Sequence, residues 1–120
     1  MVKKVLIALT NGPENPEKAV LPFIIANAAT VTDAEEIVIM LQGPGVWIAK
    51  KGVAEHVLCC KWSLGDLLQK FLEGGGKLLV CSPCLEERQI GQEDIIDNAS
   101  IAGAVEFLER ASESDVVLTY

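Results

Sequence analysis

Three short runs in the chain are apolar at nearly every position, and they limit the folds that the sequence can adopt. The runs are VLIAL from Val5, IVIML from Ile37 and KLLVC from Lys77. A strand with one face in water alternates apolar and polar residues, whereas a strand buried on both faces is apolar throughout, as in parallel sheets. These runs therefore predict parallel strands, and DVVLTY at the end of the sequence is a fourth candidate.

Helical patterns separate the expected strands. We expect helices over residues 17–29, in a short segment after Gly45, over residues 63–73 and over residues 100–111. The alternation of strand and helix predicts one α/β domain over residues 1–120, flavodoxin-like, with three layers in the order α/β/α. Its mainly parallel sheet would have four or five strands, with helices on both faces.

Two local patterns refine these boundaries. Ser63 and Asp66 have the spacing of a capping box at the start of the third helix. The glycines at 74–76 end that helix and turn the chain into the next strand. Residues 53–61 fit either a loop or a short extra strand.

Composition excludes several classes of protein. No apolar run approaches the roughly 18 residues of a membrane helix, so we expect a soluble protein that does not bind membranes. The opening MVKKVLIAL has signal-peptide charges, but TNGPENPEK interrupts its apolar part at once, so we expect a first strand there. A net charge of −7 argues against nucleic-acid binding. Four cysteines without a secretion signal point to a reducing compartment, by default the cytoplasm.

The loops after the strands should line one rim, because ligands of open α/β sheets bind outside the carboxyl ends of the strands. These loops are TNGP at residues 10–13, QGPGVW at 42–47 and CSPC at 81–84. The expected cleft-lining residues are Asn11, Gly12, Gly43, Gly45 and Ser82. Neither nucleotide-binding glycine motif is present, so GPG at 43–45 favours a tight turn over a phosphate loop.

Cys81 is a candidate nucleophile at the junction of a strand and a helix. Ser82 would cap this helix and Pro83 would open it, which places the Cys81 thiol beside free backbone N–H groups that lower a thiol pKa. Glu86 and Glu87 act in the opposite direction and Arg88 supports the thiolate, so the sequence leaves the net direction open. The alternative is a buried thiol that packs as a small hydrophobe, which is our expectation for Cys59 and Cys60.

The pair Cys81 and Cys84 has C-x-x-C spacing, which also fits a redox dithiol or half of a zinc site. Zinc would need His56 with Cys59 or Cys60, and this set has neither a second C-x-x-C nor a paired histidine. The dithiol is therefore the stronger alternative.

Over nearly its full length the sequence resembles the DsrE/DsrF-like family of small sulfur-handling proteins. The resemblance lies in VLIALTNGPENPEKA, IVIMLQGPGVWIAKKG, GGGKLLVCSPCLEERQI and IAGAVEFLERASESDVVLTY. Its most specific element is a cysteine at the end of a strand with an arginine seven residues later, here Cys81 and Arg88. The sequence departs from the family at Gln89, where glycine is common, and at Cys84, which many relatives lack.

The resemblance implies a persulfide carrier, a possible sulfurtransferase subunit, in which Cys81 accepts sulfur from a donor protein and passes it to an acceptor protein. It implies no metal or organic cofactor, and it implies a homotrimer or homohexamer. Cys84 would be a resolving thiol or part of the core. A dithiol redox protein and a non-catalytic module that binds a small ligand remain as alternatives.

Overall fold

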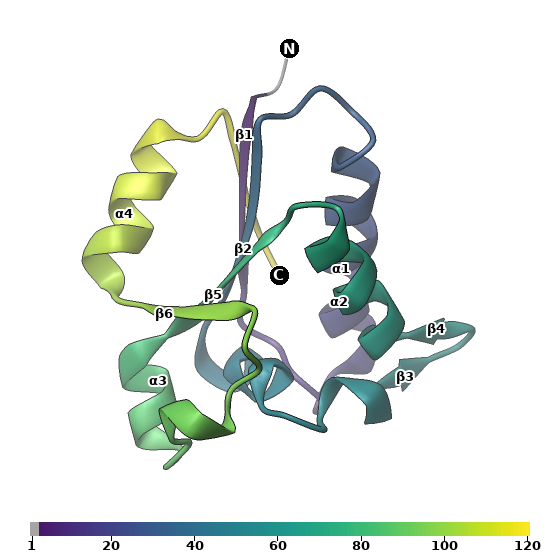
Figure 1. Ribbon diagram of the computed structural model, residues 1–120, viewed down its shortest axis with the longest axis vertical. Helices are drawn as coiled ribbons and strands as arrows, with labels where there is room; N and C mark the ends of the chain where they lie inside the picture. The colour runs from purple at the N-terminus through teal and green to yellow at the C-terminus, as the bar shows by residue number, and fades with distance from the viewer. Residues whose placement is uncertain (1–2) are drawn as a thin grey trace.

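A parallel sheet of five strands, in the order β6-β5-β2-β1-β7, forms the centre of the computed structural model, which describes residues 3–120 (Figure 1). Its strands are β1 (Lys4–Leu9), β2 (Glu36–Leu41), β5 (Lys77–Cys81), β6 (Ala99–Ala102) and β7 (Val116–Thr119). The helices are α1 (Pro16–Ala29), α2 (Leu64–Glu73), α3 (Ser82–Glu87) and α4 (Ala104–Glu113), with short 3-10 helices η1 (Gly43–Ala49), η2 (Ala54–His56) and η3 (Gln92–Asp94). Strands β3 (Leu58–Cys59) and β4 (Trp62–Ser63) form a separate antiparallel hairpin. Within residues 3–120 no helix has the length and apolar character needed to cross a membrane.

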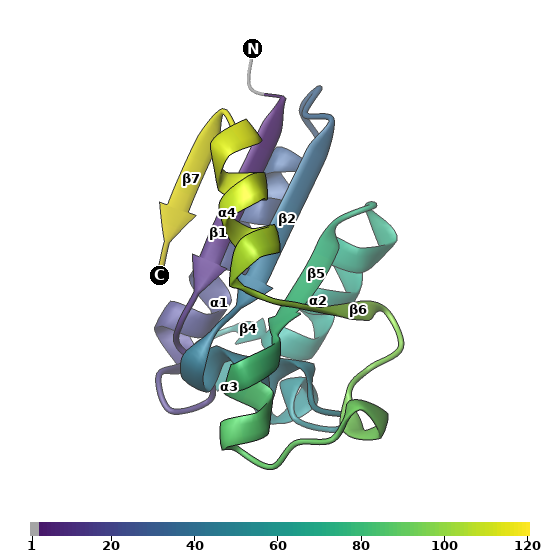
Figure 2. The same ribbon diagram turned by 90° about the vertical axis from the view of Figure 1, so that its left-hand side faces the viewer.

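The sheet is covered on both faces, as the uniformly apolar strands predict. Alternate residues of a strand point to opposite faces, so Ile7 and Ile39 join the core beneath α1 and α2, while Leu6 and Val38 join a smaller core beneath α4. Figure 2 shows α4 on one side of the sheet and α1 and α2 on the other. The prediction of a three-layer domain with a parallel sheet is therefore confirmed.

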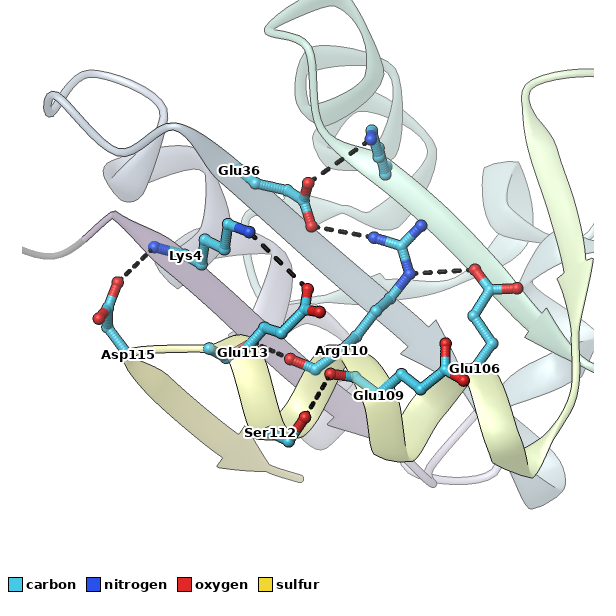
Figure 3. Close-up of polar contacts among 10 residues, drawn as sticks. Lys4, Glu36, Glu106, Glu109, Arg110, Ser112, Glu113 and Asp115 are labelled. Carbon is cyan, nitrogen blue, oxygen red and sulfur yellow. Dashed lines mark hydrogen bonds and ion pairs between the residues drawn. The ribbon is translucent and has the colours of Figure 1, made fainter.

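Helix α4 is attached to the sheet by charged side chains as well as by its core contacts. Arg110 donates from Nη1 to Glu36 Oε1 at 2.9 Å and from Nε to Glu106 Oε2 at 3.0 Å (Figure 3). Asp115, just after the helix, accepts the backbone N–H of Lys4 at 2.9 Å. These contacts lie at the amino ends of β1 and β2, away from the loops that follow the strands (Figure 3).

The structure corrects three details. The helix expected over residues 100–111 begins at Ala104, because Ala99–Ala102 pairs with β5 as edge strand β6, a strand too short to predict. Ser63 occupies the N-cap of α2, but its side chain makes no capping hydrogen bond, so the capping box is wrong. The ambiguous residues 53–61 hold η2 and the first strand of the β3–β4 hairpin.

Candidate functional site

The three loops expected at one rim are packed directly against one another. A β-carbon added to Gly12 would overlap the carbonyl oxygen of Pro44, so the loop after β1 lies against the loop after β2. A β-carbon on Gly45 would overlap the carbonyl oxygen of Leu9. Both glycines are buried, which means that they hold the loops together and do not line an open cleft. The absence of a side chain at these positions is what allows the loops to meet.

The third loop joins this assembly through a sulfur atom. The backbone N–H of Gly43 donates to Cys84 Sγ, with 3.2 Å between nitrogen and sulfur. Gly43 has a φ of 53°, in the left-handed region that glycine adopts most readily. Gly43, Asn11 and Ser82 were expected at the rim, and all three are partly exposed. The contact between Gly43 and Cys84 could not be predicted, because the two residues lie 41 positions apart.

Cys81 is the last residue of β5 and the N-cap of α3, a position that sequence analysis assigned to Ser82. Its side chain is half-buried, and Cys84 lies three residues later in the first turn of α3. Burial and the hydrogen bond with the Cys84 thiol raise the pKa of Cys81, while the Cys84 N–H and the charge of Arg88 lower it by less. The net direction that the sequence left open is therefore upward.

Arg88 ends α3 and is fixed by the same loop. Its Nη1 donates to the backbone oxygen of Cys84 at 3.0 Å, which holds its charge where it lowers the pKa of Cys81. Together with Pro13, Glu14, Pro44 and Trp47, Arg88 lines a shallow hollow of about 470 Å³. Trp47 is half-buried and forms part of the wall of this hollow.

Of the two cysteines expected to pack as small hydrophobes, Cys59 packs against the core and Cys60 does not, contrary to the prediction for Cys60. They belong to the β3–β4 hairpin, where Cys59 is half-buried and Cys60 is exposed. The loop between the paired residues Cys59 and Trp62 has only two residues, and its first, Cys60, has a φ of 56°. This turn could not be predicted, because such positions are normally occupied by glycine, asparagine or aspartate.

The alternative zinc site is not assembled. His56 is exposed on η2. Within residues 3–120, no three side chains of histidine, cysteine, aspartate or glutamate lie close enough to hold a metal ion. The structure therefore brings together Cys81, Cys84, Arg88 and the Gly43 amide as one group, and leaves Cys59 and Cys60 as a second, separate pair.

Comparison with known proteins identifies one family and two relatives of different length. The model of the DsrE/DsrF-like family matches residues 3–120. The uncharacterized protein MJ0989 of Methanocaldococcus jannaschii is 28% identical, over 98% of this chain and 99% of the relative. The uncharacterized protein MJ0760 of the same organism is 30% identical over 96% of this chain, which spans only 42% of that relative.

Solved structures share the fold at low sequence identity. The ychN protein of E. coli has a TM-score of 0.75 and 19% identity, and each chain is covered completely. The protein of unknown function MTH1491 of Methanobacterium thermoautotrophicum has a TM-score of 0.74 and 12% identity, over 98% of this chain and 99% of that one. These likenesses support the arrangement of the sheet and helices, and they carry no residue assignments.

Proposed function

The chain belongs to the DsrE/DsrF-like family, and from this premise we propose that Cys81 carries sulfur as a persulfide. Membership in the family supports a role related to sulfur relay. The observation that carries the finer proposal is the position of Cys81 at the carboxyl end of β5, half-exposed and beside Arg88 and the Cys84 N–H. Thiol exchange needs an accessible sulfur and a fraction of thiolate, and it needs no cofactor.

Sulfur would move in two exchange steps. In the first step the Cys81 thiolate attacks the outer sulfur of a donor persulfide, which forms a Cys81–S–SH group and releases the donor as a thiolate. In the second step an acceptor thiolate attacks that outer sulfur, and the electron pair of the broken bond returns to Cys81. Each step exchanges one sulfur–sulfur bond for another, so no oxidant or reductant is required.

The neighbours of Cys81 support this chemistry to different extents. Arg88 and the Cys84 N–H favour the thiolate, both for attack and for departure. Burial opposes ionisation, so Cys81 is mostly protonated at neutral pH. We propose that Arg88 is a positioning residue, because its guanidinium is held at the Cys84 carbonyl oxygen.

Intact-mass analysis tests the proposal. The protein is incubated with glutathione persulfide, separated from the donor and measured before and after reduction. We expect a gain of one sulfur that reduction removes, and peptide mapping should locate it on Cys81. Sulfur found on Cys60 while Cys81 is unmodified would overturn the assignment, since Cys60 is the more exposed thiol.

A dithiol redox protein is the second candidate, and the placement of Cys81 at the N-cap and Cys84 in the first turn of α3 favours it. Residues three apart at a helix start have β-carbons about 5–6 Å apart, close enough for a disulfide after a small adjustment. Oxidised glutathione would then convert the pair to a disulfide without any persulfide. If that disulfide forms readily and no sulfur is ever accepted, this second function replaces the first.

A homo-oligomer, a trimer or a pair of trimers, is part of the proposal, together with donor and acceptor proteins and a reducing, cytoplasmic location. Exposed apolar side chains on and beside α4 support self-association: Val105 is 71% exposed and Leu108 is 65% exposed. Light scattering at micromolar concentration should give a multiple of the chain mass. A measured mass near 12.9 kDa would contradict the oligomer.

A further inference from the structure

We propose that Cys84 resolves the Cys81 persulfide, so that this protein releases its sulfur as hydrogen sulfide when no acceptor is bound. The inference rests on the proposed function, since it needs a persulfide on Cys81. It adds an activity that a simple carrier lacks, because the stored sulfur is reduced and not only passed on.

The first observation is that Cys84 Sγ has its own hydrogen-bond donor. The Gly43 N–H reaches it at 3.2 Å, from a different loop. A backbone amide that donates to the sulfur holds Cys84 Sγ in one position from outside its own helix. Cys84 is half-buried, which shields this hydrogen bond from competing water.

The second observation is that the Gly43 amide is held in position on both sides. Pro44 lies against Gly12 and Gly45 lies against Leu9, with no room for a β-carbon at either glycine. The Gly45 N–H also donates to the carbonyl oxygen of Gln42 at 2.9 Å. The donor therefore points at Cys84 before any reaction takes place, so no loop has to rearrange.

The third observation is the position of the two cysteines: Cys81 is the N-cap of α3, Cys84 lies three residues later in its first turn, and both side chains pack against the same core. When Cys81 carries an extra sulfur, its own Sγ stays bonded to the same β-carbon and remains within reach of Cys84. Attack at this inner sulfur is the step that produces a protein disulfide.

The reaction balances as follows. The Cys84 thiolate attacks Cys81 Sγ, a Cys81–Cys84 bond forms, and the bond from Cys81 Sγ to the outer sulfur breaks. The electron pair of that bond leaves with the outer sulfur, which departs as HS⁻ with the persulfide proton. The outer sulfur is reduced and the two cysteines are oxidised to a disulfide. Two equivalents of a low-molecular-weight thiol then restore the dithiol and form one small disulfide.

The test follows sulfur after loading. The full-length protein is loaded with glutathione persulfide, separated from the donor and left without an acceptor or a thiol, while sulfide and intact mass are measured over time. Release is scored per loaded chain, so differences in loading do not enter the comparison. We expect one sulfide for each loaded chain, together with a Cys81–Cys84 disulfide in the peptide map.

Two variants test whether Cys84 and the amide that binds it take part in sulfide release. Cys84→Ser keeps an acceptor for the Gly43 N–H, and it should slow sulfide release by at least about tenfold. Gly43→Ala should slow release as well, because a side chain at a φ of 53° disturbs the amide. Gly52→Ala is the matched control: it has the same kind of backbone cost, with a φ of 84° and no atom within 4 Å of the added carbon, and it should release sulfide at the wild-type rate.

The outcomes distinguish this inference from the proposed function. Loading followed by release at equal rates in the wild type and Cys84→Ser would overturn the inference alone. Sulfide release without formation of the Cys81–Cys84 disulfide would also overturn the inference alone. So would a result in which Gly43→Ala and Gly52→Ala slow sulfide release equally. Failure of the wild type to load any sulfur on Cys81 would overturn both.

Discussion

The two cysteine pairs of this protein, Cys81 with Cys84 and Cys59 with Cys60, contain the same thiol groups but lie in different surroundings. In each pair partial burial and the neighbouring thiol raise the pKa of the first cysteine, Cys81 or Cys59. At Cys81 a backbone N–H and Arg88 counteract this rise. At Cys59 the carboxylate of Glu17 raises the pKa further. A pair of adjacent thiols is thus not reactive in itself, and the charges and dipoles around it decide which thiol can ionise.

The pairs also differ in how they are held. Cys81 and Cys84 lie where three loops interlock through buried glycines and the Gly43 amide. Cys59 and Cys60 lie on a hairpin of two-residue strands that packs against α1 through β3 and against α2 through β4, at the edge of the molecule (Figure 1). The first arrangement fixes sulfur positions for a directed exchange, while the second leaves Cys60 open to any reagent in solution.

The largest expected effect comes from substituting Cys81 in one pair and both cysteines in the other. Cys81→Ser should lose stable persulfide loading completely, because Cys59 and Cys60 lack the Arg88 environment and the Cys84 sulfur is held by the Gly43 N–H. The double variant Cys59→Ser and Cys60→Ser should load one sulfur as the wild type does. Intact mass after glutathione persulfide treatment measures both. Equal loading in Cys81→Ser would remove the functional difference between the pairs.

A clash placed between the interlocked loops should be the next largest effect. Gly45→Ala puts a β-carbon against the Leu9 carbonyl oxygen, and we expect a loss of about 1–3 kcal/mol in the free energy of unfolding. Gly103→Ala, where the added carbon meets open space, should cost less than about 1 kcal/mol. Urea denaturation gives both values. Similar costs would mean that the loop packing contributes little to the site.

The pH dependence of alkylation should follow from the raised pKa of Cys81. Only the thiolate reacts, so the iodoacetamide rate should rise about tenfold per pH unit across neutral pH, without levelling off before the ordinary thiol pKa. A background without Cys60 avoids its competing reaction, and peptide mapping separates Cys81 from Cys59. A plateau below neutral pH would show that the amide and Arg88 outweigh burial.

The smallest expected effect concerns the hairpin turn. Cys60→Gly relieves a left-handed backbone and should stabilise the protein by up to about 1 kcal/mol, offset in part by the greater freedom of glycine in the unfolded chain. Thermal unfolding of the reduced protein measures the change. A loss of stability would show that the Cys60 side chain makes a contact worth more than the strain.

Much of the fold could be predicted because its strands are unusually uniform. Strands that are apolar at nearly every position are stable where both of their faces are buried, here between two layers of helices. Strands β1, β2 and β5 appear where they were expected. Strand β6 could not be predicted, because Ala99–Ala102 is a short edge strand with two exposed residues and is paired only through β5. Its register is a property of the sheet and not of its own four residues.

The sequence by itself determined the layered domain, the rim at which three loops meet, and the place of Cys81 at the end of a strand. These follow from local patterns and from the rule that parallel strands present their carboxyl ends together. Tertiary structure alone decided the direction of the Cys81 pKa, the exposure of Cys60 and the contact between Gly43 and Cys84. Burial and hydrogen bonding between distant segments depend on how closely the loops pack. At this rim the loops pack closely because the glycines where they meet have no side chain, and this matters only in the folded chain, where the loops come together.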